Sequence, residues 1–114
     1  MGYRVMIIPE ARAAIDRDIA YLRARAAPDV VDRWFTGLID AIRSLSTMPK
    51  RCSLIPEHWM FEDEFRHLLY GSRRHQKRII IFFESNVVNV VHYRHGSLPP
   101  LSLDEQDSPP ELDS

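Results

Sequence analysis

The sequence has few of the residues on which most small active sites are built. Its single cysteine, Cys52, excludes an internal disulfide framework and a Cys-rich zinc site. Its four glycines form no Gly-rich phosphate loop, and its five histidines show no metal-ligand spacing. No apolar run reaches the roughly 18 residues of a membrane span. The apolar stretch at the start of the chain is too short for a secretory signal. We therefore expect a cytoplasmic protein that uses no metal, no cofactor and no membrane.

Basic residues are missing from the C-terminal end of the chain. Residues 99–114 hold five acidic residues and no basic one, whereas residues 1–98 hold all 15 Lys and Arg against 11 Asp and Glu. With four prolines and little apolar surface, residues 99–114 cannot offset the entropy cost of ordering. We predict one domain over residues 1–98, followed by a disordered acidic tail. The tail either keeps the protein soluble or folds back over the basic domain and competes with an anionic ligand.

Hydrophobic periodicity predicts one strand and two helices in the first half of the chain. Residues 3–8 are β-prone and end at a proline. Apolar residues then recur at helical spacing over residues 11–26 and again over 28–45, with a proline suited to the first turn of the second helix. Two amphipathic helices joined by so short a turn pack antiparallel as a helical hairpin.

The second half of the chain predicts a loop and three strands. Residues 50–64 lack periodicity and predict a loop, with Trp59 and Phe61 packed onto the core. Alternating or continuous apolar runs then predict strands over residues 65–70, 78–84 and 87–94. The strand over residues 78–84 is apolar on both faces, which predicts a central position in the sheet. The fold class is α+β in the order β-α-α-β-β-β, with the helical hairpin on one face of a small antiparallel sheet.

Basic residues concentrate between residues 65 and 78, where no acidic residue occurs. Crowded positive charges are stabilised by an anion, and arginine binds phosphate with a bidentate fork. The segment is therefore a candidate nucleic-acid-binding surface, made of Arg66, Arg73, Arg74, Lys77 and Arg78. The alternatives are a solvated turn, which explains Arg73 and Arg74 by themselves, and ion pairing with the preceding acidic run of residues 62–64.

A second polar cluster, His92-Tyr93-Arg94-His95-Gly96, ends the last predicted strand. Strand alternation directs His92 and Arg94 to one face and Tyr93 and His95 to the other. Metal-free RNA cleavage uses such groups: one removes the 2′-OH proton, an arginine stabilises the charge on phosphorus, and another protonates the leaving oxygen. The alternative is that Tyr93 and one histidine are interior or rim residues with satisfied hydrogen bonds.

Several short motifs, taken in their order and spacing over residues 3–98, resemble the RelE/ParE superfamily of toxins from bacterial type II toxin–antitoxin systems. They are Pro9-Glu10-Ala11, Ala27-Pro28-Asp29, Phe65-Arg66-His67-Leu68-Leu69-Tyr70-Gly71, Lys77-Arg78-Ile79-Ile80 and Val90-Val91-His92-Tyr93-Arg94-His95-Gly96. The resemblance implies a microbial-ribonuclease-like fold, a role in plasmid stabilisation through growth arrest, and a cognate antitoxin whose C-terminal segment wraps the toxin.

The resemblance leaves the cellular target open. Ribosome-dependent members cut mRNA with basic residues on the sheet and a C-terminal Arg, Tyr or His, whereas ParE-like members act on DNA gyrase and lack that set. The positions that match the ribonuclease set are Arg66, Arg78, Arg94 and His95. After Gly96 the chain continues Ser97-Leu98-Pro99, where ribonuclease members commonly carry further basic residues. This departure favours a gyrase toxin that is not an enzyme over a metal-independent endoribonuclease acting on ribosome-bound mRNA.

A third reading is a decayed, non-toxic module that binds nucleic acid or a partner protein. The toxin reading predicts an exposed apolar surface on the helices or beside the sheet, where an antitoxin helix or strand docks. Val30 and Ile39, which widen the apolar stripe of the second helix, are consistent with such a surface, and packing in the core explains them equally well. We also expect Arg66 and Arg78 to be at least partly exposed to solvent.

Overall fold

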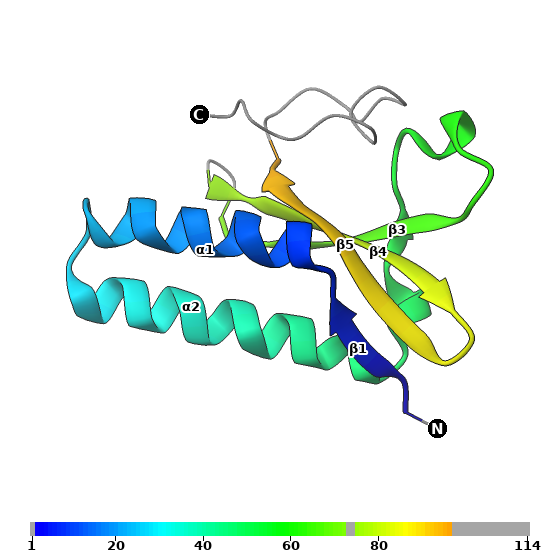
Figure 1. The fold of residues 1–114 in the computed structure, drawn as a ribbon, viewed down its shortest axis with the longest axis horizontal. Coiled ribbons are helices and arrows are strands. Elements are labelled where there is room, and N and C mark those ends of the chain that lie inside the picture. The colour runs from blue at the N-terminus through cyan, green and yellow to red at the C-terminus, as the bar shows by residue number, and fades with distance from the viewer. Residues whose placement is uncertain (1, 73–74, 97–114) are drawn as a thin grey trace.

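Two antiparallel helices cover one face of a five-stranded sheet in the part of the chain that the structure describes, residues 2–72 and 75–96 (Figure 1). The computed structural model confirms the predicted α+β class. Its helices are α1 (Pro9–Arg23) and α2 (Pro28–Arg43), and its strands are β1 (Arg4–Ile7), β2 (Ser53–Leu54), β3 (Phe65–Tyr70), β4 (Lys77–Glu84) and β5 (Val87–His95). The predicted tail and Arg73 and Arg74 lie outside the described residues.

Proline begins both helices. The N–H that proline lacks would have no partner within the first turn, and the fixed φ of proline suits a helix. Glu10 and Asp29 follow directly and complement the positive end of each helix dipole. The residues that face the sheet are buried, among them Ala11 and Ile15 of α1 and Leu38 and Ile42 of α2. The predicted helical hairpin is confirmed, although α1 ends at Arg23, three residues before the apolar pattern does.

The sheet is mixed, which corrects the prediction of an antiparallel sheet. Its strand order is β1-β5-β4-β3-β2, and β1 runs parallel to β5 while all other neighbours are antiparallel. The connection from β1 to β5 contains both helices and three strands, so no tight turn imposes an antiparallel pairing. The edge strand β2 lies inside residues 50–64, which the sequence predicted to be a loop.

The central strand β4 is apolar on both faces, as predicted. Ile79 and Ile81 pack against the helices, and Ile80 packs on the opposite face with Ile55, Phe61 and Phe65. A β-bulge in β5 shifts the register opposite Ile80 and Ile81. Because of this extra residue, both Val90 and Tyr93 of β5 belong to the core under the helices.

Phe61 lies against the apolar cluster that Ile55 and Ile80 form on the face away from the helices, as predicted. Trp59 does not pack on the core, which corrects the prediction for that residue. Trp59 belongs to the short 3-10 helix η3 (His58–Met60), and it is 76% exposed. None of the described helices is long and apolar enough to cross a membrane.

Gly37, in the middle of α2, admits the side chain of Tyr70. The Tyr70 hydroxyl donates a hydrogen bond to the carbonyl of Trp34 at 2.6 Å, and a Cβ at position 37 would overlap that hydroxyl oxygen. Although Ala is favoured over Gly by about 1 kcal/mol in a helix, we expect Gly37→Ala to lower the midpoint of thermal unfolding. Adding Tyr70→Phe should recover part of the loss, and a stabilised Gly37→Ala protein would contradict this account.

Candidate functional site

The sheet face turned away from the helices carries basic side chains on three neighbouring strands. Arg78 of β4 pairs in register with Arg94 of β5, while Ile80 pairs with His67 of β3 and His92 of β5. Residues paired across antiparallel strands share a face, and Ile80 packs away from the helices. Arg78, Arg94, His67 and His92 therefore lie on one face, which we call the basic face.

Arg78 is at the centre of the basic face, and it is buried rather than partly exposed as the sequence predicted. Its Nη2 atom lies 2.8 Å from Glu57 Oε1 and its Nη1 atom 3.1 Å from Glu57 Oε2, with 8% and 3% of the two side chains exposed. Its Nε–H donates to His67 Nδ1 at 3.2 Å. The two-pronged fork that would bind a phosphate thus holds an internal carboxylate.

His67 is held in its neutral form by these neighbours. Burial lowers the pKa of His67 below its usual value, and the Arg78 guanidinium lowers this pKa further, against a smaller opposite effect of Glu57. Protonation at Nδ1 would remove the acceptor of the Arg78 hydrogen bond and place a second cation beside the guanidinium.

Protein stability is therefore expected to fall as the pH decreases below about 6.5, the unperturbed pKa of histidine. The unfolded chain binds the His67 proton at a higher pH than the folded protein does, so acid favours unfolding. Urea unfolding between pH 7.5 and pH 5 should show a shallower loss for His67→Gln, whose amide oxygen can accept the Arg78 hydrogen bond. His58→Gln, at an exposed position, is the control, and equal pH slopes for the wild type and His67→Gln would contradict the assignment.

Arg66 does not belong to the basic face. It pairs in register with Ile81, which packs under the helices, so its side chain leaves the sheet on the helix side. There its Nη1–H donates to the carbonyl of Cys52 at 2.6 Å, and its Nε–H donates to Glu64 Oε2 at 2.7 Å. The alternative reading of ion pairing with the acidic run is confirmed for Glu64.

Lys77 also faces the helices. Its Nζ atom lies 3.3 Å from Asp18 Oδ2 of α1, and the buried Tyr93 hydroxyl donates to the same carboxylate. Burial and the neighbouring Asp18 raise the pKa of Tyr93 far above its usual value. Tyr93 is thus an interior residue with a satisfied hydrogen bond, and the three side chains join α1 to the end of the sheet.

His95 pairs in register with Lys77 and lies on that same side of the sheet. Of the four residues that match the ribonuclease set, the basic face therefore brings together only Arg78 and Arg94. Arg66 and His95 lie on the helix side. Glu57, which the sequence analysis missed, comes from the aperiodic segment before β3 and gave no sequence signal other than its negative charge.

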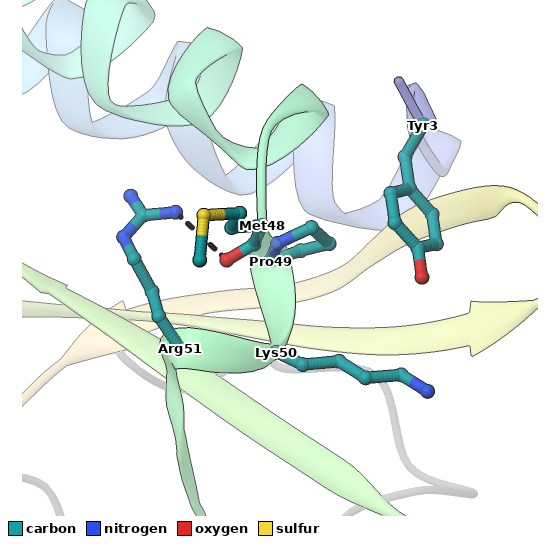
Figure 2. Close-up of a pocket in the computed structure, with 5 residues that line it drawn as sticks. All are labelled: Tyr3, Met48, Pro49, Lys50 and Arg51. Atoms are coloured by element: carbon teal, nitrogen blue, oxygen red, sulfur yellow. Dashed lines mark hydrogen bonds between the residues drawn. The ribbon is translucent and has the colours of Figure 1, made fainter. Parts of the chain in front are cut away.

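A surface hollow at the end of α2 is built from structural parts (Figure 2). It is lined by Tyr3, Met48, Pro49, Lys50 and Arg51. Arg51 Nη1 donates to the carbonyls of Thr47 and Met48, which link the 3-10 turns η1 (Ser44–Ser46) and η2 (Pro49–Arg51), and Met48 adopts a left-handed conformation with φ of 50°. These hydrogen bonds hold the chain where it turns toward β2, which gives Arg51 a structural role in this hollow.

Metal binding finds no support in the residues that the structure describes. They contain no group of three or more His, Cys, Asp or Glu side chains placed to hold an ion. The central arginine of the basic face, Arg78, is already neutralised by Glu57. The same ion pair attaches the segment that carries Glu57 to the sheet.

No protein-family model and no curated protein matches the sequence. Among solved structures, one chain of the chromosomal ParDE TA system from P. aeruginosa superposes with a TM-score of 0.66. The match covers 82% of this chain and 95% of that chain, at 9% sequence identity. At so low an identity the likeness shows the fold alone: this chain shares the α+β fold of that ParDE chain, in agreement with the fold class that the sequence predicted.

Proposed function

We propose that this protein is the toxin of a type II toxin–antitoxin module, which arrests growth by acting on DNA gyrase and is neutralised by a cognate antitoxin. The observation that carries the proposal is the fold that the chain shares with nearly the whole of a ParDE chain. The motifs over residues 3–98 point to the same superfamily independently of the coordinates. Fold alone does not determine activity, so the choice of target has to come from the side chains.

The division of the basic residues supports gyrase over RNA as the target. Cleavage of RNA requires a base, an acid and a group that stabilises phosphorus to converge on one phosphate. Here Arg66 and His95 lie on the helix side of the sheet, and the Arg78 fork is filled by Glu57. A toxin that acts by binding a target protein needs no such convergence of catalytic groups.

The helical hairpin supports an antitoxin as partner. Tyr21 of α1 and Val30 of α2 are exposed large apolar side chains, 54% and 46% accessible, on either side of the turn between the helices. Exposed apolar side chains on helices are a common docking surface for a helix or an extended segment. The sequence analysis found Val30 and Ile39 consistent with such a surface; Val30 is exposed, whereas Ile39 is half-buried.

Expression from a tightly repressed promoter, with and without the adjacent small open reading frame, tests the proposal. We expect growth arrest that the neighbouring gene product relieves, with loss of plasmid supercoiling before any loss of intact mRNA. Arrest with mRNA cleavage first would favour the ribonuclease. Unimpeded growth with confirmed soluble protein would contradict a toxin altogether and favour a decayed binding module.

A further inference from the structure

Trp59 is the most exposed of the large apolar side chains among the described residues, at 76%. It stands in η3, between β2 and β3, in a segment of residues 55–64 that we call the Trp59 loop. Tryptophan has the largest apolar surface of any side chain and normally lies at least partly inside a protein. Its exposure here is therefore informative, because the same loop buries Ile55 before it and partly buries Phe61 after it.

The Trp59 loop is fixed to the sheet before and after the tryptophan. Ile55 is fully buried against Ile80, and the Glu57 carboxylate forms the buried bidentate pair with Arg78. On the other side Phe61 packs edge-on against Phe65, with ring centroids 5.4 Å apart. These contacts hold the loop on the basic-face side of the sheet, so Glu57 serves to anchor it.

The backbone between the anchors is also ordered by hydrogen bonds. The N–H of His58 donates to the carbonyl of Ile55 at 3.0 Å, and the N–H of Phe61 donates to that of His58 at 3.2 Å. The tryptophan is thus presented from a fixed backbone rather than from a free loop. When a partner buries Trp59, little backbone entropy is lost on binding, which favours tight binding.

The charge beside Trp59 indicates the kind of partner. Glu62 and Asp63 are exposed in the same loop, and Glu64 is exposed and paired with Arg66. Carboxylates at this site repel the phosphates of a nucleic acid, whereas they complement basic side chains of a protein. An exposed tryptophan bordered by acidic residues fits an apolar pocket that is bordered by Lys or Arg.

The Trp59 loop is far from the surface that we assign to the antitoxin. Figure 1 places η3, drawn in green, and the turn between α1 and α2 at opposite ends of the molecule. A toxin needs two protein contacts, one with its antitoxin and one with its target. Tyr21 and Val30 at one end and Trp59 at the other give the molecule an exposed apolar surface for each of these two contacts.

We propose that the Trp59 loop is the surface through which this protein docks on its target, by inserting Trp59 into an apolar pocket bordered by basic side chains. This inference rests on the proposed function, in which the target is DNA gyrase. Glu62 and Asp63 then steer the encounter, and the Glu57–Arg78 pair keeps the loop in its binding conformation.

Purified gyrase and the arrest of growth together test this inference. Trp59→Ala is expected to raise the concentration needed for half-inhibition of supercoiling by about tenfold or more, and to relieve arrest in cells. It should still bind the antitoxin with unchanged affinity. The matched control is Met48→Ala, an equally exposed apolar residue outside the loop at 72% accessibility, which should inhibit like the wild type.

Two further variants separate docking from a loss of folding. Trp59→Phe keeps an aromatic ring and should fall between the wild type and Trp59→Ala. Glu62→Lys with Asp63→Lys leaves Trp59 in place and should weaken inhibition most at low salt, where steering is strongest. Thermal unfolding midpoints close to that of the wild type would confirm that all of these variants are folded.

The possible failures can be told apart. If the wild type arrests growth and inhibits gyrase while Trp59→Ala does so equally well, the inference is overturned and the proposed function stands. If Trp59→Ala loses antitoxin binding but stays toxic, the loop contacts the antitoxin and the inference is also overturned. A wild type without effect on growth or supercoiling overturns the proposed function, and the inference with it.

Discussion

Arg78→Ala is expected to lower the free energy of unfolding by about 3–5 kcal/mol, one of the two largest effects that we foresee. The substitution leaves the Glu57 carboxylate buried without the guanidinium that neutralises it, and it removes the donor to His67 Nδ1. Both side chains of the pair are more than nine-tenths buried, so the carboxylate that is left has little contact with bulk solvent. Urea unfolding at neutral pH measures the change directly.

Replacement of both partners provides the control. Glu57→Leu with Arg78→Met removes both charges of the buried pair, and such exchanges are often neutral or stabilising. The double variant should therefore be more stable than Arg78→Ala, and the difference isolates the penalty of a buried charge. An Arg78→Ala protein as stable as the wild type would show that the pair with Glu57 is not maintained in solution.

This expected loss of stability changes how a toxicity assay at Arg78 has to be interpreted. If the Arg78→Ala protein unfolds, relief of growth arrest follows from the lack of folded protein. It then gives no information on whether Arg78 touches RNA. Trp59, which is exposed, does not have this ambiguity, and for that reason the docking experiment is built on it.

Much of the fold follows from local patterns in the sequence. The helical repeats predicted α1 and α2, and the run of residues 65–70 gave β3 with its observed bounds. The parallel pairing of β1 was missed because it joins segments about eighty residues apart in the sequence, a choice made by long-range packing. The strand β2 was missed because two residues carry no periodicity.

The candidate site was harder to predict, because basic residues that are neighbours in the sequence lie on opposite faces of the sheet. Lys77 and Arg78 are neighbours in β4 and must point to opposite faces, and Arg78 shares a face with the buried Ile80. That alternation was visible in the sequence and predicts an interior arginine in need of a carboxylate. Its partner Glu57 lies 21 residues away in an aperiodic loop, so only the folded chain identifies it.

Leu38→Ala is the second substitution with a large expected effect, a loss of about 2–5 kcal/mol in the free energy of unfolding. Leu38 lies in the middle of α2, is fully buried, and belongs to the core that the helices form with β4 and β5. Truncation removes three side-chain carbons from that core and leaves a cavity that the rigid sheet cannot fill. Thermal or urea unfolding of the isolated protein measures the loss.

Val30→Ala is the matched control on the same helix, because Val30 is 46% exposed and its truncation should change stability by no more than about 0.5 kcal/mol. The contrast between the two positions distinguishes the face of α2 that supports the fold from the face available to an antitoxin. If Leu38→Ala also had almost no effect, the apolar stripe of α2 would not be packed on the sheet in the isolated protein. The helical hairpin would then depend on the antitoxin for its packing, and the surface assigned to that partner would have to include the core face of α2.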